Sequence, residues 1–242
     1  MSSRSPAGLG PNISSQLLCV WASPASTLCW LIGFLWLAGF APPLSPNAPA
    51  VEIANYYRDH ATAIRIGLCL TMLGAALIGP FVAAISTQMK RIEGEHSPLA
   101  NTQLGLGMLM VLLFVIPCFL LGTAAFRPER DPELILLLND AGWLPFVGAF
   151  QCTFIQLLAI AACIFKDKEQ RVFPRWLAYF NVWVALLLWP AGFVLFFRTG
   201  PFAWDGVLAF WLVLVVFCSW FLLMFWEVRK AILRHAAEAS TM

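Results

Sequence analysis

Six long stretches of the chain carry almost no charged side chain, and this pattern restricts the chain to one broad class of fold. Arg65 is the only charged residue within them; the stretches cover residues 17–41, 61–89, 104–126, 141–165, 176–197 and 206–226. About 20 apolar residues in a helix cross the hydrocarbon core of a bilayer. Since lipid offers the backbone no hydrogen-bond partner, each stretch is expected to be helical. The sequence therefore predicts an all-α, polytopic membrane protein, a bundle of six transmembrane helices.

The composition excludes a water-soluble domain. Hydrophobic residues make up 60% of the 242 residues and charged residues only 12%, whereas about 25% of a soluble domain is charged. A soluble fold of this length has no interior large enough to bury so much apolar surface. A disordered chain is excluded as well, because disorder requires low hydrophobicity and high charge.

The basic residues are divided unevenly between the two sides that six helices define. Ten lie beside the termini and the second and fourth loops: Arg4, Lys90, Arg91, Lys166, Lys168, Arg171, Arg175, Arg229, Lys230 and Arg234. Five lie on the other side: Arg58, Arg65, Arg127, Arg130 and Arg198. Cytoplasmic loops carry the excess of lysine and arginine. We therefore expect a cytoplasmic segment at 1–16, the transmembrane domain at 17–230 and a cytoplasmic tail at 231–242.

Two loops on the expected outer side contain helix-start signals. Asn47-Ala48-Pro49 precedes an apolar segment, and Asp131-Pro132-Glu133 combines an N-cap acid, an early proline and an acid in the first turn. We expect a short interfacial helix after each, the first of which could continue into the second span. The first span has a rival interpretation. Gly39-Phe40-Ala41 has the small residues of a signal-peptidase site, and cleavage there would leave five helices.

Small residues recur every four positions along the second span. They are Gly67, Thr71, Ala75, Gly79, Ala83 and Thr87. Such residues let two helix backbones approach closely, so we expect a helix-packing face and a central position for the second helix. The sixth span carries large aromatic side chains all round, which favours a peripheral, lipid-facing position.

Aromatic residues and prolines add two further expectations. Aromatic rings favour the headgroup level of a bilayer, so anchoring roles are expected at the span ends for Trp143, Phe202, Trp204, Phe173, Trp176 and Trp226. Prolines lie inside four spans, at Pro80, Pro117, Pro145 and Pro190. Each removes a backbone donor and can bend its helix. Bent helices are ordinary in membrane bundles, but they can also open cavities.

The polar residues of the spans each allow a structural and a functional interpretation. Arg65 either extends to the outer headgroups or contacts an anion or a lipid headgroup, together with His60, Arg127 and Asp140 of the same outer layer. The amides of Gln151, Gln156 and Asn181 either form interhelical hydrogen bonds or line a small cavity. Because amides do not exchange protons, they would bind or orient a ligand there.

Several functions are disfavoured because the residues that they need are missing from the spans. No span contains a lysine that could hold retinal, or a deep acid for ion-coupled transport. His60, His96 and His235 fall on opposite sides, which argues against haem. The seven cysteines lack metal-ligand spacing, and the net charge is only +2. We therefore expect no metal, no cofactor and no nucleic-acid partner.

Several motifs carry a resemblance over most of the chain. Residues 52–91 have the form EIxxYYxxHxxxIRxGxxLxxxGAAxxxPFxAxIxxQxKR, and AFRPER, LND, FPRW and TGPFAWDG follow at 125–130, 138–140, 173–176 and 199–206. Together they resemble a group of bacterial six-helix integral membrane proteins that has no established activity. The resemblance implies a fold and the bacterial inner membrane, but no reaction and no catalytic residues.

The sequence supports one leading hypothesis on function and two alternatives. Bent, uncharged helices beneath a polar and aromatic outer layer favour a non-enzymatic role, which is binding, passage or partner support for an apolar or lipid-like molecule. Membrane lipids are expected partners, with a membrane protein or an apolar small molecule besides. One alternative is a membrane-embedded enzyme acting at the outer face through His60, Arg65, Arg127 and Asp140. The other is a scaffold subunit without a ligand.

Overall fold

The computed structural model describes residues 12–240, and every regular element in this range is a helix. The elements are α1 (Ile13–Trp30), the π-helix η1 (Leu31–Leu37), α2 (Ala50–Glu93), α3 (Pro98–Phe126), α4 (Pro132–Gly148), α5 (Gln151–Lys166), α6 (Arg175–Leu187), the 3-10 helix η2 (Trp189–Leu195), the π-helix η3 (Val207–Leu212) and α7 (Val213–Ser240). The predicted all-α class is confirmed.

The number of spans is confirmed as well. Within residues 12–240, 6 helical segments are long and apolar enough to cross a membrane: Ile13–Leu37, Ala50–Glu93, Pro98–Phe126, Pro132–Lys166, Arg175–Leu195 and Val207–Ala239. The second and fourth of these are much longer than the predicted stretches 61–89 and 141–165. The protein is therefore a multi-pass membrane protein built as a six-helix bundle.

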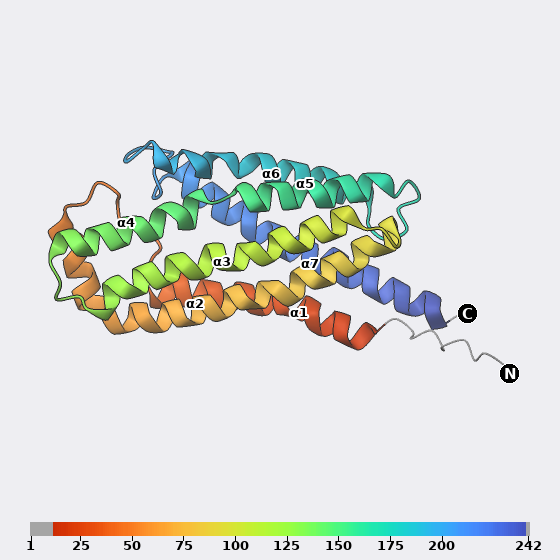
Figure 1. The fold of residues 1–242 in the computed structure, drawn as a ribbon, viewed down its shortest axis with the longest axis horizontal. Coiled ribbons are helices and arrows are strands. Elements are labelled where there is room, and N and C mark those ends of the chain that lie inside the picture. Colours follow the sequence, from red (N-terminus) through yellow and green to blue (C-terminus); the bar gives the residue numbers. More distant parts are fainter. Residues whose placement is uncertain (1–11, 241–242) are drawn as a thin grey trace.

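The spans run back and forth, so both ends of the described chain lie at one end of the bundle (Figure 1). We call this the terminal end; the loops at 94–97 and 167–174 lie there too. The opposite end holds the loops at 38–49, 127–131 and 196–206. Of the predicted segments 1–16 and 231–242, residues 1–11 and 241–242 lie outside the described residues.

The two expected short helices are the first turns of longer ones. Pro49 is the N-cap of α2, which then runs without a break to Glu93. Asp131 caps α4 by accepting a hydrogen bond from Glu133 N at 2.9 Å, and α4 continues to Gly148. Within α4, the buried side chain of Asn139 accepts a hydrogen bond from the Tyr57 hydroxyl at 3.1 Å. The helix starts were predicted correctly, but the second does not form a separate interfacial helix.

The interior consists of two hydrophobic cores stacked along the bundle. The terminal core includes Phe81, Phe173 and Trp220, and the opposite core includes Phe34 and Trp143. Phe150 and Val213 pack against both cores. The helices also change at this boundary: α1 gives way to a π-helix, α4 is separated from α5, α6 becomes a 3-10 helix and η3 becomes α7. Two different packing arrangements thus meet near the middle of the bundle.

The second span is the most buried of the six, with 56% of its apolar window inside the protein. A Cβ atom on Gly67 would lie 2.7 Å from Ala38 N, and one on Gly33 would lie 2.6 Å from Gly67 O. Farther along, Gly79 faces Met108 of α3, and Thr87 is exposed. Positions four apart turn by about 40° around an α-helix with each step. The row of small residues therefore starts against α1 and η1 and ends away from them.

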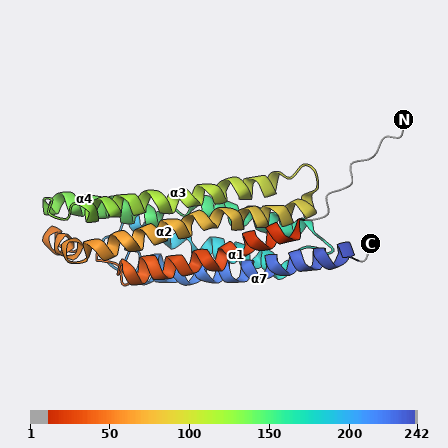
Figure 2. The same cartoon turned by 90° about the horizontal axis from the view of Figure 1, so that it is seen from below.

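Two expectations about aromatic residues hold only in part. The sixth span is not simply lipid-facing: Trp220 and Phe221 of α7 are buried, and α7 lies beside α1 (Figure 2). Of the six expected anchors, Trp143, Phe173 and Trp204 are buried inside the protein, Phe202 is half-buried, and Trp176 and Trp226 are exposed. Trp204 instead donates a hydrogen bond to Leu44 O at 2.8 Å, which ties the first and last loops of the opposite end together.

Replacing Gly67 with alanine is expected to destabilise the bundle. The added methyl group would overlap the backbone of Gly33 and Ala38, which cannot move as a flexible side chain could. Overpacking of this kind costs about 1–3 kcal/mol. The apparent melting temperature of the purified protein in detergent should fall by several degrees.

Gly105→Ala is the matched control. No atom lies within 4 Å of a Cβ placed on Gly105, and alanine is favoured over glycine inside a helix by about 0.5–1 kcal/mol. This variant should melt no lower than the unmodified protein. A Gly67→Ala protein that melts like the control would contradict the close contact of α2 with η1 and with Ala38, which follows η1.

Candidate functional site

The four residues predicted for an outer-face site lie at the opposite end but do not form a cluster. His60 stacks on Tyr56 with the ring centroids 4.6 Å apart, and its Nδ1 lies 3.0 Å from Tyr56 O. Arg65 donates to Ala61 O at 3.2 Å, on its own helix. The Arg127 side chain is exposed, and Asp140 is half-buried. Among the described residues, no hydrogen bond or ion pair joins any two of these four side chains.

The three predicted amides occupy three different environments. Asn181 is buried between α6 and α7, where it donates to Leu177 O at 2.8 Å and accepts from Trp220 Nε1 at 2.9 Å. Gln151 is exposed and donates to Gly148 O at 3.3 Å. Gln156 is buried against Gly107 and makes no hydrogen bond to the described protein. None of the three lines the cavity described next.

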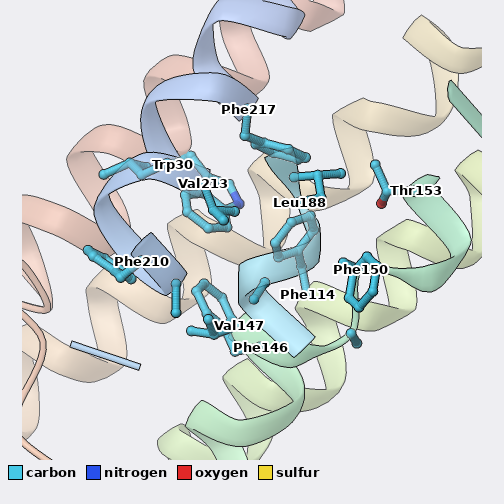
Figure 3. A pocket seen from close by; sticks show the side chains of 14 residues that line it. Trp30, Phe114, Phe146, Val147, Phe150, Thr153, Leu188, Phe210, Val213 and Phe217 are labelled. Atoms are coloured by element: carbon cyan, nitrogen blue, oxygen red, sulfur yellow. The ribbon is translucent and has the colours of Figure 1, made fainter. Parts of the chain in front are cut away.

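A cavity of about 80 Å³ lies at the boundary between the two cores (Figure 3). We call it the central cavity. Its walls come from α1, α3, α4, α5, α7 and the segments between them: Trp30, Phe114, Phe146, Val147, Ala149, Phe150, Thr153, Leu188, Ala191, Ala209, Phe210, Val213, Leu214 and Phe217. No charged residue is among them.

The central cavity lies where three of the spans lose regular α-helical structure. Ala149 and Phe150 form the gap between α4 and α5, Leu188 marks the change from α6 to η2, and Val213 the change from η3 to α7. Pro145 and Pro190 precede or begin two of these irregular segments. At membrane depth, irregular backbone is tolerated only where protein buries it or where it lines a cavity. Each of these irregular segments contributes residues to the central cavity, and each of η2 and η3 also carries exposed side chains, among them Trp189, Leu195 and Val207.

Aromatic rings hold the walls in fixed positions. Phe146 stacks on Trp30 and on Phe34, with centroids 5.3 and 4.4 Å apart and interplanar angles of 18° and 10°. Phe114 meets Trp30, Phe146 and Phe217 edge to face, at 4.9, 5.7 and 5.8 Å. Such pairs favour these geometries beyond the area that they bury. The cavity therefore presents flat and edge-on ring surfaces that are already in place.

The lining contains few polar groups. The Thr153 hydroxyl donates a hydrogen bond to Met110 Sδ at 3.3 Å. Trp30 Nε1 is buried and has no acceptor in the described protein, and Figure 3 shows this nitrogen among the side chains of the lining. A water molecule inside a protein typically makes about three hydrogen bonds. The cavity is thus better suited to an apolar occupant than to water.

Two further hollows lie along the seam between α1 and α7, and each hollow shares lining residues with the next. The first is a narrow passage of about 20 Å³, which shares Trp30, Leu214 and Phe217 with the central cavity. The second is a groove of about 200 Å³, which shares residues such as Cys218 and Phe221 with the passage. Leu28 and Leu222 of the groove are among the exposed apolar side chains. The three hollows form a series from the lipid-facing surface to the interior.

Sequence reasoning missed the residues that make this site. Trp30, Phe114, Phe146 and Phe217 are aromatic residues within apolar spans, where nothing distinguishes a cavity wall from a packed core or a lipid-facing surface. Pro145 and Pro190 were the usable signals, since both lie beside the irregular segments. Comparison of the chain with family models, curated proteins and solved structures gives no match, so the function is argued from this geometry alone.

The bond between Asn181 and Trp220 is expected to contribute to stability and not to ligand binding. Asn181→Leu leaves Trp220 Nε1 buried without its acceptor, which costs about 1–3 kcal/mol. In mixed micelles, the Asn181→Leu variant should unfold at a lower mole fraction of dodecyl sulfate than the unmodified protein. Asn101→Leu, which changes an exposed amide of α3, should leave the transition in place.

The double variant Asn181→Leu, Trp220→Phe tests the mechanism. Removing both partners of a buried hydrogen bond costs less than leaving one of them unsatisfied. The double variant should therefore lose less stability than the sum of the two single variants. Strict additivity would show that the two side chains do not interact in the folded protein.

Proposed function

We propose that this protein binds an apolar, ring-bearing or lipid-like molecule in the central cavity and takes it from the bilayer through the seam between α1 and α7. One observation carries the proposal: the irregular segments of three spans converge on a single aromatic-lined cavity. Regular helices would have been the less costly solution, since broken helices release backbone groups that need new partners. A binding site explains why the breaks coincide.

The energetics favour an occupant. An unfilled apolar hollow of about 80 Å³ costs the folded protein free energy, because the atoms that line it lack contact partners on one side. An apolar ligand recovers this cost and adds about 25 cal/mol for each Å² of its apolar surface that leaves water. A ligand that enters from lipid has little apolar surface in contact with water beforehand, so it gains less from this burial than a ligand that enters from water. Affinity then depends on ring packing against Trp30, Phe114 and Phe146.

The seam provides a route that avoids both aqueous surfaces. Its hydroxyl groups are already engaged: Ser23, Ser26 and Thr27 donate to the carbonyls of Phe221, Gly74 and Ser23. The passage therefore offers an apolar surface to a molecule that moves through it. Phe217 and Phe221 lie along the passage, and rotation of their rings is the smallest movement that would widen it.

We further propose that the protein lies in the inner membrane of a bacterium with its terminal end in the cytoplasm. Nine of the ten basic residues predicted for the cytoplasmic side belong to helix ends and loops of the terminal end, whereas Arg4 lies outside the described residues. The positive-inside rule supports this orientation. The opposite end, with the aromatic layer around Trp143 and Trp204, would then face outward.

The first experiment measures binding of 1-phenyldecane, a single ring with an apolar chain, to the purified protein in lipid nanodiscs. Saturable binding with a stoichiometry near one is expected. Val213→Phe adds a ring to the cavity wall and should weaken binding at least tenfold. Val215→Phe is the matched control, because Val215 is an exposed side chain on the same helix, and it should bind like the unmodified protein.

The folding of the Val213→Phe variant is monitored by its melting temperature, and Ala149→Leu provides a second filled cavity from a different wall. Equal binding by the unmodified protein and both filled variants would contradict the proposed site. Non-saturable uptake that matches empty nanodiscs would contradict binding altogether.

The orientation is tested by thiol labelling. The seven native cysteines, all free thiols, are replaced, and His96→Cys or Arg130→Cys is introduced singly. In spheroplasts, a membrane-impermeant maleimide should label position 130 directly and position 96 only after the membrane is permeabilised. Labelling of both positions from the same side would contradict the six-span topology, and the reverse pattern would contradict the orientation.

A further inference from the structure

We infer that the ligand of the central cavity carries a hydrogen-bond acceptor, such as a ketone or ether oxygen, that receives the indole N–H of Trp30. This inference rests on the proposed function and specifies the chemical class of the ligand. It starts from a polar atom for which the fold provides no partner. Trp30 Nε1 is buried and unbonded in the described protein, and Trp30 lines the central cavity.

Two of the three buried tryptophans show what the fold does when it gives an indole a structural partner, whereas the third, Trp143, has none. Trp204 Nε1 donates to Leu44 O at 2.8 Å, and Trp220 Nε1 donates to Asn181 Oδ1 at 2.9 Å. Tryptophan N–H groups usually find a partner when they are buried. A buried donor without an acceptor costs about 1–3 kcal/mol. A ligand acceptor at Trp30 would remove that cost.

The Trp30 ring cannot readily turn to an alternative acceptor. It is stacked against Phe34 and Phe146, with centroids 5.2 and 5.3 Å away, and Phe114 meets it edge to face at 4.9 Å. These contacts fix the ring plane and hence the direction of the N–H bond. The donor is held in place before a ligand arrives, which reduces the entropy lost on binding.

The rest of the lining limits what else the ligand can carry. No charged side chain lines the central cavity, the passage or the groove. Within the central cavity, the one side-chain hydroxyl, that of Thr153, is engaged with Met110. A charged or donor-rich head would therefore lose its hydration without compensation. The ligand class is a neutral molecule with a small ring head, one or two acceptor oxygens and an apolar chain that lies along the seam.

The volumes of the three hollows support the same class of ligand. The central cavity, at about 80 Å³, has room for a small head, whereas the groove at the lipid-facing side holds about 200 Å³. The passage, which shares lining residues with both, is the smallest of the three at about 20 Å³. A head in the cavity and a chain through the passage would occupy all three hollows at once.

The experiment compares two probes of the same carbon skeleton in nanodiscs. Decanophenone has a ketone next to the ring, and 1-phenyldecane has a methylene group there. The unmodified protein should bind the ketone about tenfold more tightly, as one buried hydrogen bond allows. Trp30→Phe keeps an aromatic wall but removes the donor, so it should bind both probes with equal affinity.

Trp143→Phe is the matched control. Trp143 Nε1 also lacks a partner, but Trp143 lines none of the three hollows, so this variant should keep the preference for the ketone. Equal affinities in the unmodified protein, or a preference that persists in Trp30→Phe, would overturn the inference and leave the proposed function standing. Failure of both probes to bind the unmodified protein would overturn the proposed function, and the inference with it.

Discussion

The structure depends on one constraint: inside a bilayer, every backbone N–H and C=O group must find its partner within the protein. Regular helices meet this constraint along most of the six spans. Where α4 ends before α5, and where α6 and η3 change helix type, the segments make short-range hydrogen bonds of their own, such as Ala149 N to Pro145 O, Leu188 N to Val184 O and Phe210 N to Gly206 O. Their convergence leaves a cavity in the middle of the bundle. Aromatic side chains from the surrounding helices surround it without filling it.

The first span shows how this architecture combines a rigid side and an open side. On one face, Gly33 lies so close to Gly67 of α2 that a methyl group on either would overlap backbone atoms. On the other face, α1 meets α7 along a seam with two hollows. Tight packing against α2 fixes the position of Trp30, whereas the loose seam gives a ligand access to it. Both features belong to the first span, the close contact to η1 and the seam to α1.

The sequence was sufficient to predict the spans and the starts of helices, because hydropathy, length and capping residues act locally. Pro49 and Asp131 begin helices as expected. It was not sufficient to show which apolar surface faces protein and which faces lipid, since both environments select the same side chains. Trp143 and Trp204 illustrate this: aromatic residues near span ends are typical anchors, yet both are buried. Likewise, Pro145 and Pro190 indicated bends, but only the tertiary arrangement brings those bends to one cavity.

The account stands on the claim that the middle of the bundle is hollow and apolar. Xenon binds in apolar cavities that stay free of water, so diffraction from crystals of the protein under xenon pressure tests the claim most directly. We expect a xenon atom among Trp30, Phe114 and Phe217, with the surrounding helices unmoved. An interior in which these side chains close the space and no xenon binds would contradict it.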